Sequence, residues 1–143
     1  MKNIITLFIS AILIAGCAGS SDLEYASLNQ EPCRSETEID NPQSFVSETA
    51  ENFIVYQQGD NVYLSMDVRT YCNSKITFED PKLDGERIMI RMRNAGPTED
   101  NCVCFKNVTT SIKNIEEGTY NFMILGKSGN QLLVQKTFTV EYK

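Results

Sequence analysis

The sequence predicts an all-β domain, built as a single antiparallel β-sandwich of about seven strands. Apolar and polar residues alternate over several stretches, which is the period of a strand with one buried face. Clusters of Gly, Pro, Asn and Asp separate these stretches and supply the turns that antiparallel strands need. No stretch shows the period of about 3.6 residues that marks an amphipathic helix. A barrel is the alternative architecture.

The expected strands follow one another from Phe53 to the end of the chain. The clearest is the fourth, in which Ile88, Ile90 and Met92 point to one face and the residues between them to the other. Turn signals such as Asp80-Pro81 and Leu83-Asp84-Gly85 close the strands before it. The seven strands are predicted at residues 53–56, 62–72, 75–79, 87–93, 102–112, 120–125 and 132–142.

The first residues have the features of an export signal. Lys2 is followed by an apolar run over Ile4–Ile14, which is shorter than the roughly 20 residues that a transmembrane helix needs and suits a signal peptide. Leu13-Ile14-Ala15-Gly16-Cys17 then resembles the lipobox of bacterial lipoproteins. The resemblance implies cleavage before Cys17, a diacylglycerol on its sulfur and acylation of its amine. Several acyl chains would anchor the protein stably to a membrane.

The residues after the lipobox bear on the destination of the protein. Ala18 follows Cys17, which in bacterial lipoproteins implies passage to the outer membrane. Ser20-Ser21-Asp22-Leu23-Glu24 resembles the short acidic signals that send Bacteroidetes lipoproteins to the cell surface. We therefore expect an outer-membrane protein, on the cell surface or on the periplasmic face.

Charge is distributed unevenly along the chain. Residues 22–51 hold eight acids and one base, whereas residues 52–143 hold eleven of each. An acidic segment with few large apolar residues is typical of a solvated linker. The sequence thus predicts a signal peptide over 1–16, a lipidated acidic tether over 17–51 and the β-sandwich over 52–143. Nucleic-acid binding needs a concentrated basic surface, which this balance does not predict.

The last third of the chain carries a second resemblance. Ile115-Glu116-Glu117-Gly118-Thr119-Tyr120, followed by Phe122 and Ile124, is similar to the corner before strand F in immunoglobulin and fibronectin type III folds. The resemblance implies an immunoglobulin-like sandwich in which the Tyr120 hydroxyl bonds back to the backbone. The Cys-x-Cys pair and the following strand are also similar to the C-terminal sandwich of NigD-like Bacteroidetes lipoproteins.

Four cysteines remain once Cys17 is lipidated, and an exported protein keeps such cysteines oxidised. They are Cys33, Cys72, Cys102 and Cys104. A bond between Cys102 and Cys104 would be strained, so we expect each to pair with either Cys72 or Cys33. Two alternatives compete with structural disulfides, namely a thiol redox couple and a four-thiolate zinc site.

The remaining residues offer two candidate surfaces for ligand binding. Arg87, Arg91 and Arg93 are expected on one exposed sheet face, joined by Arg69 if its strand is a neighbour, where they would suit an anionic ligand. Pairing with Glu79 or Glu86, or with the acidic tether, is the alternative, and it is the commoner arrangement on solvated sheet faces. Four tyrosines are candidates for a carbohydrate-stacking surface, namely Tyr56, Tyr63, Tyr71 and Tyr120.

Composition argues against catalysis. The 143 residues include no His, the commonest general base and metal ligand, so Ser-His-Asp and Cys-His catalysis are excluded within this chain. The acids that cluster, Asp80, Asp84, Glu99 and Asp100, fall in predicted turns. We expect no enzymatic activity, no cofactor and no bound metal.

The expectation is therefore a non-enzymatic, lipid-anchored binding or structural module of the bacterial envelope, which meets a protein or a glycan. The alternative is a periplasm-facing inhibitor or accessory subunit of an envelope enzyme, which would insert a loop such as Asn94–Asn101 into its partner.

Overall fold

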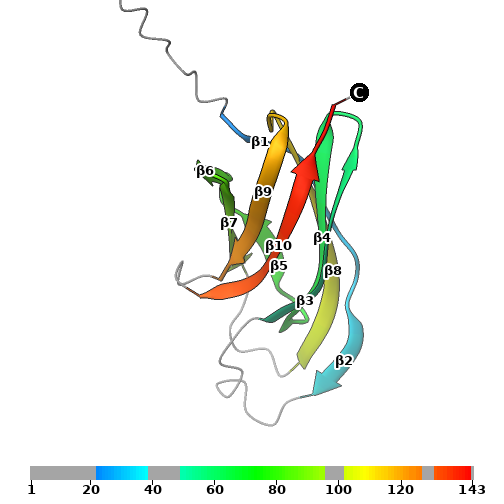
Figure 1. The fold of residues 1–143 in the computed structure, drawn as a ribbon. Coiled ribbons are helices and arrows are strands. Elements are labelled where there is room, and N and C mark those ends of the chain that lie inside the picture. Colours follow the sequence, from blue (N-terminus) through cyan, green and yellow to red (C-terminus); the bar gives the residue numbers. More distant parts are fainter. Residues whose placement is uncertain (1–21, 39–48, 96–101, 127–130, 143) are drawn as a thin grey trace, which may run out of the picture.

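The computed structural model describes residues 22–38, 49–95, 102–126 and 131–142, and within these ranges the chain has ten strands and no helix (Figure 1). The prediction of an all-β fold is confirmed. The strands form two five-stranded sheets. The first sheet contains β1 (Glu24–Gln30), β2 (Arg34–Glu38), β3 (Thr49–Gln58), β4 (Asn61–Tyr71) and β8 (Cys102–Lys113). The second contains β5 (Lys75–Phe78), β6 (Lys82–Asp84), β7 (Arg87–Ala95), β9 (Gly118–Leu125) and β10 (Leu132–Val140).

Each sheet is organised around its longest strands. In the first sheet β4 pairs with one edge of β8, β1 and β2 share its other edge, and β3 lies outside β4. In the second sheet β9 lies between β10 and β7, and β5 and β6 share the far edge of β7.

One pair of strands departs from the predicted antiparallel arrangement. β7 and β9 run parallel, with Ile88 opposite Phe122, whereas the other pairings of the described strands are antiparallel. Parallel neighbours need a crossover connection, and here the chain passes through β8 of the first sheet between them. A purely antiparallel sandwich is therefore wrong at this pair.

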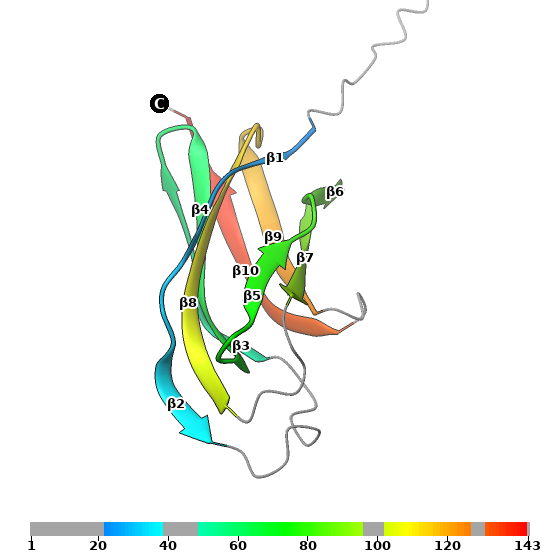
Figure 2. The same ribbon diagram turned by 180° about the vertical axis from the view of Figure 1, so that it is seen from behind.

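The two sheets enclose one hydrophobic core, and the predicted alternation places its residues correctly. Every second residue of β4 from Val62 to Val68 is fully buried, as are Ile88, Ile90 and Met92 of β7. Val108 and Ile112 of β8 and Phe122 and Ile124 of β9 complete the centre. Figure 2 shows the two layers from behind, with β8 and β4 in one and β5, β7 and β9 in the other.

Glutamine side chains link the two sheets along both of their sides. On one side Gln57 of β3 donates to the carbonyl oxygen of Glu141 at 2.8 Å and accepts from its N–H at 3.1 Å. On the other side Gln30 of β1 makes the same pair of bonds with the main chain of Ile76 in β5, at 2.5 and 3.1 Å. Gln30 thus satisfies the main chain of the edge strand β5, and Gln57 satisfies the main chain directly after the edge strand β10.

The acidic tether predicted over residues 17–51 is wrong for residues 23–38, and also for residues 49–51, which begin β3. Leu23 is only 8% exposed and belongs to the core. β1 and β2 both pair with β8. The sequence does not reveal these strands, because most of their residues are polar and exposed, so they lack the alternation that marks a strand with one buried face. The folded domain therefore already includes Leu23, β1 and β2, which precede its predicted start at residue 52.

The hydrogen bond that the resemblance to immunoglobulin folds assigned to Tyr120 is made at this corner by a different tyrosine. Ile115 is buried, and its carbonyl oxygen accepts a 2.5 Å hydrogen bond from the hydroxyl of Tyr142, after β10, rather than from Tyr120. The Tyr120 ring instead lies over Gly118, where an added Cβ would approach the ring and hydroxyl to 3.3 Å. Gly118 has a φ of +157°, so glycine suits this position in both space and backbone conformation.

Candidate functional site

The four cysteines form two disulfides at the end of the sandwich where β8 begins. Cys33 is joined to Cys104 and Cys72 to Cys102, with Cα–Cα distances of 5.6 and 5.5 Å. As the spacing predicted, Cys102 and Cys104 reach different partners, and the structure selects one of the two connectivities left open. The Cys33 sulfur lies 3.3 Å from the carbonyl oxygen of Cys72, so the two bonds are neighbours.

This closeness explains why these cysteines resemble a metal site. The sulfurs of Cys33, Cys72 and Cys104 lie within 4.8 Å of one another, as do those of Cys72 and Cys102 and a Glu36 oxygen. Metals bind thiolates, whereas these sulfurs are joined in disulfides. Cys104 is also buried, which hinders the attack by an external thiolate that disulfide exchange requires.

The predicted arginine face is only partly assembled. Arg87, Arg91 and Arg93 alternate with the buried residues of β7 and lie on the outer face of the second sheet. Arg69 lies on β4, opposite Phe105 of β8, and so belongs to the first sheet. The predicted row therefore contains three arginines, and the fourth is on a different surface.

Carboxylates accompany these three arginines, as the alternative interpretation expected. Glu79 contacts both Arg91, at 3.0 Å, and Arg93. The hydrogen bond from Arg93, followed by the charges of both guanidinium groups, lowers the pKa of Glu79. Arg87 pairs at 2.7 Å with Asp84 rather than with Glu86. Lys75 and Lys82 lie on the same face, because they pair in register with Ala95 and Met89.

The candidate tyrosines fall in three different environments. Tyr71 is buried, and Tyr120 packs against the core. Tyr56 and Tyr63 are directly opposite on β3 and β4, with stacked rings 5.1 Å apart. Tyr56 is 40% exposed and its neighbour Ile54 52%. The first sheet thus presents an aromatic pair on its outer face, in which Tyr56 is exposed and Tyr63 is half-buried.

Polar side chains surround this pair on the outer face, which we call the polar face, and Phe105 and Val103 of β8 lie farther along it. The polar side chains lie in rows across the strands, because residues opposite each other in a sheet share a face. Ser27 and Ser111 join their hydroxyls at 2.7 Å, and Thr109 donates to Ser65 at 3.1 Å. The rows contain Ser27, Ser111, Tyr63 and Tyr56, then Asn29, Thr109, Ser65 and Ile54, and then Asn107 and Asp67.

Asp67 is the centre of a hydrogen-bond network on the polar face. One carboxylate oxygen accepts from Arg34 at 2.7 Å and from Asn107 at 3.1 Å, and the other from Asn52 at 2.8 Å. These bonds, with that from Asn52 the largest cause, lower the pKa of Asp67. The sequence did not predict this network. Ser65 and Asp67 nevertheless alternate with the buried residues of β4, and this alternation indicates a polar face.

The sequence also did not identify Lys106 as a buried charged residue. It lies two residues after the inward-facing Cys104 on β8, is buried, and donates to the carbonyl oxygen of Ser74. Burial removes water from the ammonium group and so lowers its pKa.

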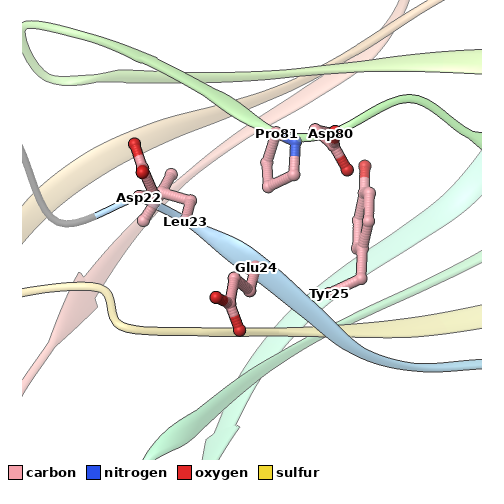
Figure 3. Close-up of a pocket in the computed structure, with 6 residues that line it drawn as sticks. All are labelled: Asp22, Leu23, Glu24, Tyr25, Asp80 and Pro81. Carbon is pink, nitrogen blue, oxygen red and sulfur yellow. The ribbon is translucent and has the colours of Figure 1, made fainter.

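A pocket lies between β1 and the segment before β6. Several acidic residues line it, but their carboxylates do not converge on one point. The pocket is lined by Asp22, Leu23, Glu24, Tyr25, Asp80 and Pro81 (Figure 3). Figure 3 shows the carboxylates of Asp22 and Glu24 pointing to opposite sides, and Glu24 pairs with Lys113 at 2.7 Å. The Tyr25 hydroxyl donates to the carbonyl oxygen of Glu79 at 2.6 Å, and burial, with the charges of Asp80 and Glu79, raises its pKa. Paired acid–base catalysis needs convergent carboxylates, so this pocket does not resemble such a site.

Several predicted features lie outside the described residues, namely the signal peptide, Cys17, Glu99, Asp100 and the loop at 96–101. Within the described ranges no helix is long and apolar enough to span a membrane. Comparison of the chain with protein-family models, with curated proteins and with solved structures finds no match.

Proposed function

We propose that this chain is a lipid-anchored, non-enzymatic binding module of the bacterial outer membrane, and that its polar face binds a neutral glycan. The stacked pair of Tyr56 and Tyr63 beside rows of hydroxyl and amide groups carries the proposal. Exposed aromatic residues are disproportionately involved in recognition. The lipid anchor comes from the lipobox that ends at Cys17.

A sugar ring matches the chemistry of the polar face. Its C–H surface stacks on an aromatic ring, and its hydroxyls exchange hydrogen bonds with Ser, Thr, Asn and Asp side chains. The polar face is also electrically balanced, because its in-register strand residues include three acids and three bases. These are Glu24, Glu51, Asp67, Arg34, Arg69 and Lys113. A balanced surface favours an uncharged ligand over an anionic one.

An immunoglobulin-like relationship remains part of the proposal. The two-sheet core and the antiparallel pairing of β9 with β10 support it. The parallel pairing of β7 with β9 differs from the antiparallel sheets of immunoglobulin domains.

The experiment measures binding of the purified protein to neutral polysaccharides, by affinity electrophoresis and on a glycan array. We expect Tyr56→Ala and Tyr63→Ala each to weaken binding roughly 5–30-fold, the range for loss of a stacking contact of about 1–2 kcal/mol. Leu83→Ala, which removes an exposed apolar side chain from the second sheet, is the matched control. Binding that survives both Tyr substitutions, or capture of a protein partner alone, would contradict the glycan assignment.

Anchoring is tested separately. Cys17→Ala is expected to release the protein from membranes, and the mass of the native protein is expected to include acyl chains. Protease digestion of intact cells then distinguishes the cell surface from the periplasmic face. Protection until lysis would favour the inhibitor or accessory function.

A further inference from the structure

The outer face of the second sheet differs in charge from the rest of the molecule. The whole chain has a formal charge of −6. On this face five bases accompany two acids, Glu79 and Asp84, which leaves an excess of three positive charges. The bases are Lys75, Lys82, Arg87, Arg91 and Arg93. We call this surface the cationic face.

The remainder of the cationic face is uncharged and partly apolar. Met89 of β7 lies opposite Met123 of β9, and Arg91 lies opposite Leu125. The outward residues of β9 and β10 are otherwise the exposed Leu132, opposite Leu125, and the polar residues Thr119, Asn121, Gln135, Thr137 and Thr139. Basic residues mixed with apolar ones are typical of surfaces that lie against anionic membranes.

The length of the tether decides how close this face is to the membrane. Because Leu23 belongs to the core, only residues 18–22 separate the folded domain from Cys17. Six residue steps span at most about 20 Å. The two sheets of a sandwich are about 10 Å apart, so this length is sufficient for the cationic face to reach the bilayer. It is too short for the domain to stand clear of the membrane, as a tether ending at residue 51 would permit.

We propose that the cationic face docks on the anionic lipid headgroups of the anchoring membrane, which leaves the polar face pointing outward. The attraction is the complementarity of the five bases to phosphate groups, acting over the short distance that the tether enforces. In this arrangement one small domain contacts the membrane with its cationic face and a ligand with its polar face, since the two outer faces of a sandwich point in opposite directions. This inference rests on the lipid anchor of the proposed function.

The experiment reads the orientation of the lipidated protein on vesicles. A fluorophore is attached through an azide-bearing residue introduced at Thr137 of the cationic face or at Asn29 of the polar face, both exposed. The vesicles carry headgroup nitroxide quenchers and are either pure phosphatidylcholine or about one-third phosphatidylglycerol. On the anionic vesicles we expect roughly twofold stronger quenching at Thr137 than at Asn29, and loss of this difference at about 1 M salt.

Two variants test which side chains are responsible. Arg87→Gln/Arg91→Gln/Arg93→Gln is expected to remove the difference, and Lys75→Gln/Lys82→Gln, which leaves the Glu79 pairs intact, is expected to reduce it. The matched control, Arg69→Gln/Lys113→Gln on the polar face, is expected to leave it unchanged. Equal quenching at the two positions on anionic vesicles, or a difference that the lysine variant does not affect, would overturn the proposal.

Flotation of the same samples separates this result from failure of the anchor. If the native protein does not float with vesicles and carries no acyl mass, the lipid anchor is wrong. If it floats on both kinds of vesicle without an orientation difference, the anchor stands and the docking proposal is wrong.

Discussion

Gln30 and Ile76 are joined by two hydrogen bonds, in which the side-chain amide of Gln30 pairs with both main-chain groups of Ile76. The amide replaces the neighbouring strand that β5 lacks at its outer edge. This contact connects β1, in the segment that the sequence assigned to a tether, to the opposite sheet. The first residues of the domain therefore help to hold the two sheets together.

We expect Gln30→Ala to destabilise the domain by about 1–3 kcal/mol, because it leaves two part-buried main-chain groups without partners. Urea unfolding followed by circular dichroism measures the change. Gln57→Ala removes the equivalent pair of bonds at an exposed position, where water replaces them, and should cost less than about 1 kcal/mol. Equal effects of the two substitutions would show that burial does not decide the cost.

The bond between Cys33 and Cys104 spans 71 residues, whereas that between Cys72 and Cys102 spans 30. In the chain-entropy model, Cys33→Ala/Cys104→Ala should cost roughly 4 kcal/mol, about 0.8 kcal/mol more than Cys72→Ala/Cys102→Ala. Limited proteolysis should then cut first within residues 24–38, since that segment loses its covalent link to β8. Unchanged protease resistance there would mean that strand pairing alone holds the segment.

Tyr142→Phe is expected to lower the free energy of unfolding by about 0.5–1.5 kcal/mol, since it removes the hydrogen bond to the Ile115 carbonyl oxygen. Tyr120→Phe is the control, because it changes the same functional group beside the same corner. Thermal unfolding of the two variants compares them directly. A larger loss from Tyr120→Phe would support the corner that the resemblance to immunoglobulin folds implied.

Asp67 should make stability depend on pH in the acid range. Its pKa in the folded protein lies below the ordinary value of 3.8, so its contribution is fully present above that value and is lost as the pH falls through the lower folded pKa. Asp67→Asn is expected to make the acid limb of a stability–pH curve less steep. Asp60→Asn, which removes a carboxylate from the exposed turn between β3 and β4, is the matched control.

Alternation predicted seven of the ten strands, because a strand with one buried face has a period of two. β4 and β7 show this most clearly, and their inward residues are the centre of the core. The period does not reveal β1, β2 or the three-residue β6, in which hydrogen bonding to a longer neighbour replaces burial. Such pairing depends on residues distant in the chain and leaves no local pattern.

The candidate surfaces also depend partly on local sequence and partly on pairing between distant residues. The sequence determined which arginines of β7 share a face, since their spacing is local, and the two-residue spacing of Cys102 and Cys104 determined that they reach different partners. Only the tertiary structure decided that Arg69 belongs to the other sheet, that Cys33 pairs with Cys104, that β7 and β9 run parallel, and that Leu23 belongs to the core. These features depend on which strands become neighbours. That choice is made by packing of the whole core and by long-range backbone pairing, which no single segment specifies.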